Sequence, residues 1–275
     1  MIQKLPAVKL AIGQTTIELK RHYTIFRIIS TLIAPIAIFI LIKLGLPDWM
    51  GGKDLFRWIL AAYLAVALSI TGLITLSAGI IGDQEDGTLL RAKTLPAGLH
   101  AHLIAKVAFL TLNSLISIVL ILISTYLASN GELLNISIRL FGLFPLIILA
   151  VSVTAPMGLI AGGISRKISA VIYITLFGYF LVAISGIFFS PDFMPLWLTY
   201  VARVFPIYWL GYLSRQILLE PHLLVDQLTA FEWSLGGGIL LGWLIFGILY
   251  VPVAIRALSR RQSGRRLEKS NSPKT

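Results

Sequence analysis

Charged side chains gather in one short polar break between two strongly apolar segments, at residues 82–96. We call this stretch the charged segment, and its main residues are Asp83, Glu85, Asp86, Gly87, Thr88, Arg91, Lys93 and Pro96. Acids precede bases, which is the order that the dipole of a short helix favours. Asp83 could cap such a helix, with Asp86 completing a capping box, and Pro96 would end it. An ordinary solvated loop is an equally good interpretation of the same residues.

The chain lacks the residue patterns of a nucleotide site and of common hydrolases. No G-x-x-x-x-G-K-[ST], H-E-x-x-H or G-x-S-x-G pattern occurs in it. Cysteine is absent, which excludes thiol chemistry. His100 and His102 are two residues apart, and this spacing puts them on different faces of a helix. We therefore expect no catalytic residue, no metal site and no cofactor bound by this chain.

The composition predicts a membrane protein. Hydrophobic residues make up 57% of the chain and the mean hydropathy is +0.88. Only 13% of the residues are charged, against roughly 25% in an average soluble domain. A water-soluble fold of 275 residues cannot bury so much apolar surface. The net charge of +11 is explained by basic residues beside apolar spans, so a nucleic-acid partner is not expected.

Six apolar stretches, each near the roughly 20 residues that cross a bilayer, predict an all-α polytopic membrane protein with six transmembrane helices. The predicted spans are 28–46, 58–81, 103–128, 140–163, 168–189 and 235–255. We expect residues 1–255 to form one transmembrane domain, followed by a basic tail, 256–275, that is disordered beyond about Arg261. The spans carry no Asp, Glu, His or Arg near the bilayer centre, and ion-coupled carriers usually need such groups. A transporter of this kind would need an external source of energy.

Most of the 23 Lys and Arg residues lie in the segments 1–27, 82–106, 165–167 and 256–275. The positive-inside rule places these segments in the cytoplasm. Both termini and the charged segment are therefore predicted to be cytoplasmic, in the cytoplasmic (inner) membrane of a bacterial cell.

Two further patterns have alternative interpretations. Before the first span, an apolar helical face with basic residues on its flank predicts an interfacial amphipathic helix, and a frayed polar tail is the weaker alternative. Its residues are Leu5, Val8, Ile12, Leu19, Tyr23 and Phe26, flanked by Lys9, Lys20 and Arg27. In the third span, Asn113, Ser117 and Ser124 share one face. Such a polar stripe usually packs against another helix, but it could also line a transport path.

The aromatic segment 190–233 falls outside the cell in this orientation. Its apolar part is broken by Pro206, which predicts an external re-entrant helical hairpin before the last span. Backbone of that kind is tolerated at membrane depth only where protein or water covers it. An aromatic belt at the membrane interface would use the same side chains.

The order of these motifs resembles a known family. E-D-G-T-L-L-x-x-x-x-L-P from Glu85, then His102-x-x-x-Lys106, is similar to the loop after span two in ABC-2 type permeases. These are the membrane subunits of ATP-driven exporters, here with most likeness to the drug- and antibiotic-export branch. A second match, after span five, comprises Gly186, Pro191, Met194, Pro195, Phe205, Pro206 and Tyr208. The family often has an acid at the position of Leu90, so here the acidic contact falls to Asp83, Glu85 or Asp86.

The resemblance implies a separate ABC ATPase subunit that binds ATP and Mg²⁺ and receives the charged segment in a groove, supported by the N-terminal helix. It also implies a homodimer of the permease, or a heterodimer with a related permease, embedded in membrane lipid. In the related permeases the region after span five resembles an outer gate, which here would comprise Pro191, Met194, Pro195, Phe205, Pro206 and Tyr208.

The function predicted first is the permease subunit of an ABC exporter, which couples ATP hydrolysis to outward transport of a drug-like, lipid-linked or other amphipathic substrate. A non-transporting assembly or sensor subunit could use the same loop to dock a cytoplasmic ATPase. A membrane enzyme acting on lipids ranks last, because the spans contain no cluster of carboxylates or histidines.

Overall fold

The structure is a computed structural model, and it describes residues 4–45, 52–94, 98–129, 141–165, 167–188, 195–219 and 229–271. Every regular element in these ranges is a helix. The order is α1 (Lys4–His22), α2 (Ile25–Gly45), α3 (Gly52–Ile70), the π-helix η2 (Thr71–Thr75), α4 (Leu76–Glu85), α5 (Thr88–Thr94), α6 (Gly98–Ala128), α7 (Leu143–Ile164), α8 (Ala170–Ile184), α9 (Leu196–Val204), α10 (Pro206–Leu218) and α11 (Ala230–Asn271).

Five helical stretches in the described ranges are long and apolar enough to cross a membrane: Ile28–Gly45, Asp54–Glu85, Ala101–Ala128, Leu143–Ile164 and Ala230–Tyr250. They correspond to five of the predicted spans. The remaining one, 168–189, coincides with the apolar helix α8, which has 15 residues. At about 1.5 Å per residue, α8 is shorter than the roughly 30 Å of a hydrocarbon core. The sixth span therefore stays a prediction.

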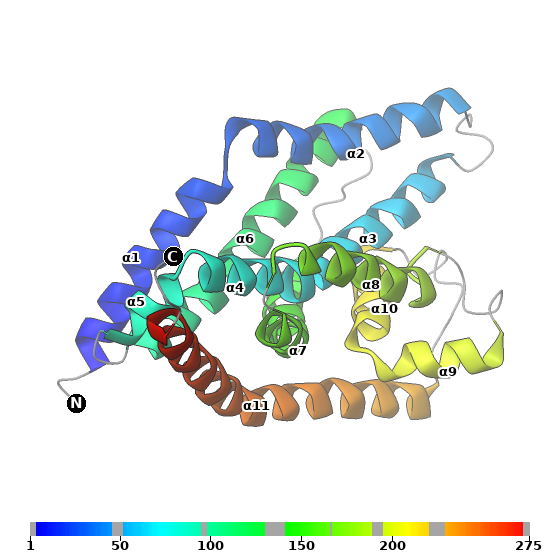
Figure 1. Cartoon of the computed structure of the whole chain (residues 1–275). Helices are drawn as coiled ribbons and strands as arrows, with labels where there is room; N and C mark the ends of the chain where they lie inside the picture. Colours follow the sequence, from blue (N-terminus) through cyan, green and yellow to red (C-terminus); the bar gives the residue numbers. More distant parts are fainter. Residues whose placement is uncertain are drawn as a thin grey trace.

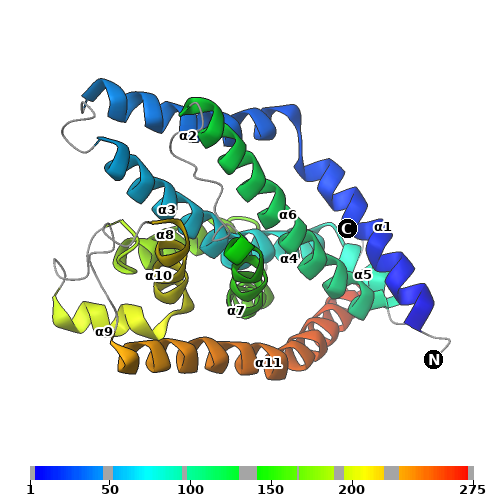
Figure 2. The ribbon, with the colours of Figure 1, turned by 180° about the vertical axis from the view of Figure 1, so that it is seen from behind.

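The bundle has two distinct ends (Figure 1). At one end, which we call the α5 end, lie α1 and α5. The opposite, α9 end carries α9, the end of α2 and the start of α3. Both ends of the described chain lie at the α5 end, and the view from behind shows the same arrangement (Figure 2). The basic tail continues as helix α11 to Asn271, whereas the sequence predicted disorder beyond about Arg261.

The stretch α3–η2–α4 runs through the middle of the bundle, and its window Asp54–Glu85 spans 32 residues. At about 1.5 Å per residue it exceeds the roughly 30 Å of the hydrocarbon core, a length that a tilted helix or ends beyond the apolar layer would accommodate. Two glycines bring η2 close to α7. A Cβ atom at Gly72 would overlap Thr154 Oγ1, and one at Gly158 would overlap the carbonyl oxygen of Gly72.

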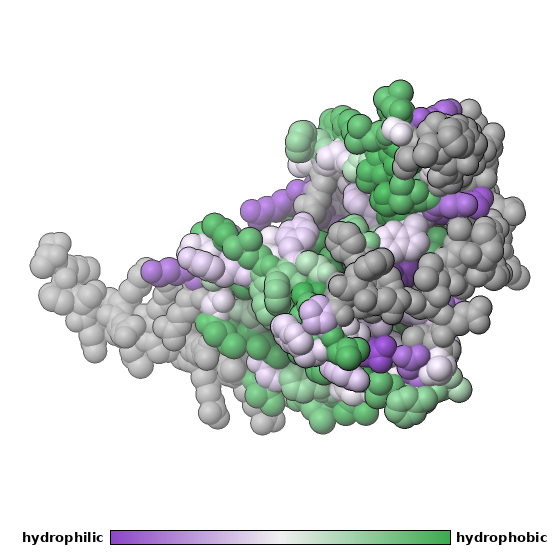
Figure 3. All heavy atoms as spheres, turned by 90° about the vertical axis from the view of Figure 1, so that its right-hand side faces the viewer, coloured by the Kyte–Doolittle hydropathy of each residue, from purple (hydrophilic) through white to green (hydrophobic). Residues whose placement is uncertain are grey.

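Many large apolar side chains are exposed. Ile25, Phe26, Leu41 and Leu44 on α2 are exposed, as is the aromatic face of α8 around Tyr173. Seen from the α9 end, apolar side chains form much of the described surface (Figure 3). In water such a surface would aggregate, so this surface is suited to lipid or to a second membrane subunit.

The aromatic segment forms two helices that meet at a proline. α9 ends at Val204, Phe205 is extended, and Pro206 starts α10, so the predicted break at Pro206 is confirmed. α10 is buried against α3, α7 and α11. Trp209 Nε1 donates to Arg203 O at 2.7 Å, and Trp243 Nε1 donates to Val204 O at 3.0 Å. These two indoles pair carbonyl groups that the end of α9 leaves without helical partners.

Candidate functional site

The charged segment forms a helix–turn–helix corner at the α5 end. α4 continues to Glu85, Asp86 and Gly87 make the turn, and α5 begins at Thr88. Gly87 has a φ of 71°, a left-handed conformation that glycine adopts without steric cost. Of the two interpretations that the sequence left open, the structure shows the short helix rather than the loop, and the predicted start at Asp83 is wrong. Asp83 lies in the last turn of α4 and does not cap α5, because α4 runs two residues past it.

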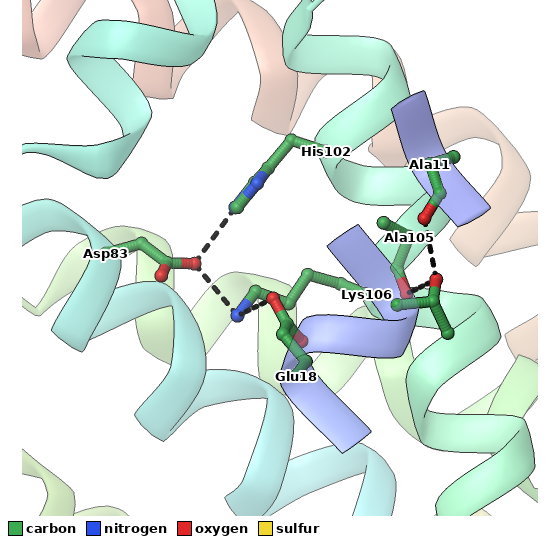
Figure 4. Close-up of polar contacts among 7 residues, drawn as sticks. Ala11, Glu18, Asp83, His102, Ala105 and Lys106 are labelled. Carbon is green, nitrogen blue, oxygen red and sulfur yellow. Dashed lines mark hydrogen bonds and ion pairs between the residues drawn. The ribbon is translucent and has the colours of Figure 1, made fainter. Parts of the chain in front are cut away.

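Asp83 is held by two bases of α6 (Figure 4). Its Oδ2 atom lies 2.9 Å from His102 Nε2 and 3.0 Å from Lys106 Nζ. An ionised carboxylate can only accept, so the imidazole donates this hydrogen bond. The side chains of His102 and Lys106 are 4% and 9% exposed. An acid in the last helical turn opposes the helix dipole, and these two donors compensate for its position.

Lys106 also binds an acid of the N-terminal helix. Its Nζ atom lies 2.8 Å from Glu18 Oε1, so one ammonium group bridges α1 and α4 (Figure 4). One turn earlier on α1, the Thr15 hydroxyl is shared between Ala11 O of its own helix at 2.9 Å and Ala105 O of α6 at 3.2 Å. We call Glu18, Asp83, His102 and Lys106 the charge cluster. It fixes the α5 ends of α1, α4 and α6 to one another.

The neighbouring residues Gln84 and Glu85 connect the same corner to a second loop. Gln84 Nε2 donates to Gly162 O at 2.8 Å, near the end of α7. The backbone N–H of Ile168 donates to Glu85 Oε1 at 2.7 Å, in the turn between α7 and α8. The last turn of α4 is therefore bonded to α6, α7 and the start of α8 together.

Only part of the charged segment faces outward. Asp86 and Arg91 are exposed, whereas Leu89 and Ala92 are 1% and 4% exposed, so α5 is seated on the bundle by its apolar side. Thr88 is half-buried. The side chain of Lys93 and the whole of Pro96 lie outside the described residues. Of the three predicted acids, Asp83 and Glu85 bond within the chain, and Glu85 and Asp86 are both exposed.

The polar stripe of α6 is divided. Asn113 and Ser117 receive Tyr23, whose hydroxyl lies 3.0 Å from Asn113 O and Oδ1 and 3.4 Å from Ser117 Oγ. Ser124 is buried and bonds locally to Ile121 O. The first two thus pack against the junction of α1 and α2, as the more frequent interpretation of such a stripe predicts.

Four of the six residues predicted as an outer gate lie in the described part of the chain, and their role as a gate stays a prediction. Pro206 and Tyr208 are buried in the first turn of α10, Phe205 is half-buried, and Pro195 is exposed before α9. Pro191 and Met194 lie outside the described residues. Beside Tyr208 lies an ion pair that the sequence did not suggest, between Arg203 Nη2 and Glu232 Oε1 at 3.0 Å.

Comparison with known proteins identifies the family. The sequence profile of the ABC-2 type transporter matches residues 7–219, which is most of the chain. The chain belongs to the ABC-2 type transporter family. It is a multi-pass membrane protein and the permease component of a transporter, whose family pairs with an ABC ATPase subunit. No curated protein matches the chain.

Sequence reasoning had noted His102 and Lys106 of this ABC-2 permease only as a motif, and it had missed Glu18 and the role of Tyr23. One pattern could have revealed part of the cluster. His102 and Lys106 are four apart, so they share a helical face, and that face opens a span directly after the acids that close the preceding one. Within the described ranges, no group of three or more His, Asp or Glu could hold a metal ion.

Proposed function

We propose that this chain is the permease subunit of an ABC exporter and that the charged segment is where a separate ATPase transmits force. The observation that carries the proposal is the corner between α4 and α5. It exposes Asp86 and Arg91, buries Leu89 and Ala92, and is bonded through Asp83 and Glu85 to the helices around it. A partner that moved α5 would therefore move several helices at once.

The charge distribution supports a cytoplasmic position for the α5 end. Most of the Lys and Arg residues belong to segments at this end, and the positive-inside rule then puts both termini in the cytoplasm. ATP and Mg²⁺ would reside on the ATPase. Two permease copies would form the transport path, and closure of the ATPase pair would drive an amphipathic substrate outward across the cytoplasmic membrane of a bacterium.

The first experiment tests docking. The permease is purified together with its cognate ATPase, once as wild type and once with Asp86→Lys. We expect the charge reversal to reduce recovery of the complex by about tenfold, since loss of one charge-assisted contact is worth about 1.4 kcal/mol. Asp54→Lys, which alters a partly exposed acid at the opposite end of the bundle, is the matched control. Equal recovery of both variants would contradict the docking role.

The second experiment separates transport from a docking-only sensor or assembly subunit. The complex is reconstituted into vesicles loaded with a fluorescent phospholipid or with an amphipathic cationic dye. An exporter moves at least one of the two probes upon addition of ATP, and the Asp86→Lys complex does not. If the complex hydrolyses ATP but moves neither probe, and neither probe changes the rate of hydrolysis, the sensor interpretation would be favoured.

A further inference from the structure

Two cavities follow one another along α6, starting at the α5 end. The larger, which we call the groove, measures about 930 Å³ and lies between the junction of α1 and α2, the stretch η2–α4, and α6. Its lining combines charged and apolar side chains, among them Glu18, Arg21, Asp83, Asp86 and Lys106, and Phe26, Ile74, Leu76, Phe109 and Leu110. The smaller, which we call the inner cavity, measures about 240 Å³ and is lined by α3, η2, α6 and Tyr179 of α8.

The inner cavity is polar but carries no charge. Among the described residues that line it are Thr71, Thr75, Asn113, Ser114 and Ser117, and none of its lining residues is acidic, basic or His. The π-helix η2 forms one wall, and such distortions occur frequently at functional sites. A cavity of this composition can exchange hydrogen bonds with a neutral group. It would disfavour a charged one, which needs a counter-ion when it is removed from water.

One side chain of the inner cavity, Ser114, has a hydroxyl group that a ligand could pair. Ser114 is 3% exposed, and within the described part of the chain its Oγ atom has no hydrogen-bond partner. Buried hydroxyl groups in folded proteins are normally bonded, so an exception calls for an explanation. A ligand that enters the inner cavity would supply the partner.

Tyr23 stands between the two cavities. His22 and Thr24, its chain neighbours, line the groove, whereas Asn113 and Ser117, which bind its hydroxyl, line the inner cavity. Thr75 lines both cavities. On α6, Leu110 of the groove precedes Ser114 of the inner cavity by four residues, which is about one helical turn.

We propose that the groove and the inner cavity are one binding passage, closed in this structure by Tyr23. Its ligand is an amphipathic molecule with an uncharged, hydrogen-bonding head. The head binds in the inner cavity and the apolar part remains in the groove. The volumes fit this division, because about 240 Å³ is below the range of roughly 300–1,000 Å³ for sites of whole drug-sized ligands.

The same element connects this gate to the charge cluster. Tyr23 and Thr24 are the non-helical junction after α1, and Glu18 on α1 pairs with Lys106, which pairs with Asp83 beside α5. A displacement of α5 would reach Tyr23 through these contacts. This inference rests on the proposed function for its direction, but the passage itself can be tested without transport.

The natural absence of cysteine makes the test direct, because each variant then contains a single thiol. Ser114→Cys is prepared in the full chain, in inside-out membrane vesicles, and treated with the uncharged reagent 2-hydroxyethyl methanethiosulfonate. Ser124→Cys, on the same helix and equally buried but outside both cavities, is the control. The rate of thiol modification is measured with native Tyr23, with Tyr23→Phe and with Tyr23→Ala.

We expect slow modification of Ser114→Cys with native Tyr23 and a rate about tenfold higher with Tyr23→Phe, because loss of the hydroxyl contacts shifts the closed state by about that factor. Tyr23→Ala should raise the rate further, and Ser124→Cys should stay slow throughout. The proposed closure by Tyr23 is wrong if Ser114→Cys reacts equally fast with native Tyr23 and with either Tyr23 variant. The proposed passage is wrong if Ser114→Cys reacts no faster than Ser124→Cys even with Tyr23→Ala.

The class of ligand is tested by protection. The Tyr23→Phe, Ser114→Cys variant is modified in the presence of decyl glucoside, decyltrimethylammonium or decyl sulfate, each below its micelle-forming concentration. The neutral-headed probe should slow modification several-fold while the two charged probes do not. Equal protection by all three, or by none, would overturn the assignment of a neutral head. These rates require neither ATP nor an ATPase, so a failure here is distinguishable from a failure of the exporter proposal.

Discussion

Asp83, in the last turn of α4, and Lys106, on α6, form an ion pair of 3.0 Å. The same ammonium group holds Glu18 at 2.8 Å. Two carboxylates from different helices thus share one base that is only 9% exposed. Their mutual repulsion is compensated only while Lys106 is charged and in place.

Lys106→Met should therefore destabilise the permease more than removal of any exposed lysine. We expect a loss of about 1–3 kcal/mol, between the values for exposed and for fully buried pairs. The measurement is thermal unfolding in detergent. Lys20→Met, at an exposed position of α1, is the control. Adding Asp83→Asn and Glu18→Gln should restore much of the loss, and a Lys106→Met protein as stable as the control would contradict the role of the cluster.

Glu85 and Asp86 are adjacent acids with different predicted roles. Glu85→Ala removes the acceptor of the Ile168 N–H group and should cost about 1 kcal/mol. Hydrogen exchange of residues 167–170 should then become faster. Asp86→Ala, at the neighbouring and likewise exposed position, does not remove this acceptor and should leave the exchange unchanged. Equal exchange in the two variants would show that Glu85 does not hold the turn between α7 and α8.

The close crossing of η2 and α7 predicts an unequal response of two glycines in one helix. Gly158→Ala places a methyl group against the carbonyl oxygen of Gly72 and should cost about 1–3 kcal/mol. Gly163→Ala meets no atom within 4 Å and should be neutral or slightly stabilising. Both are compared by thermal unfolding. If Gly158→Ala were as stable as Gly163→Ala, the two helices would have to be farther apart than described.

Arg215 is a buried base that ties α10 to the end of α8. Its Nη1 atom donates to Gly186 O at 2.8 Å, and its guanidinium lies 5.9 Å from the ring centre of Trp58. Arg215→Met should cost about 1–3 kcal/mol, because it leaves a buried carbonyl group unpaired. Arg57→Met breaks the Arg57–Asp54 pair, which is partly exposed, and should cost at most about 1 kcal/mol. Similar losses in both variants would contradict the anchoring role of Arg215.

Parts of the site were readable from local pattern and parts were not. The break at Pro206 follows from the geometry of proline alone, which is why it was predicted at the right residue. The start of α11 was placed too late, although Thr229 and Glu232 form a capping box in the structure and have its sequence spacing. Glu232 interrupts an apolar run with a charge, so hydropathy alone placed the start of the span after it.

The position of Asp83 shows where local pattern fails. An acid followed by a turn and a short helix indicates an N-cap, and local propensity contains nothing to oppose it. The structure continues α4 because His102 and Lys106, which come from another helix, compensate for a negative charge at a helix C-terminus. Only a contact between distant residues could decide between the two.

The sequence by itself determined that this is a membrane protein, because a water-soluble fold could not bury so many apolar residues. It also determined where five of the six predicted spans fall and that the charged segment interrupts them, because these features depend on composition over windows of about 20 residues. The tertiary structure decided which charges face inward and which outward, and it brought Glu18 to Lys106 and Tyr23 to Asn113 on α6. Those choices depend on which helix faces come together, and hydropathy along the chain carries no record of that.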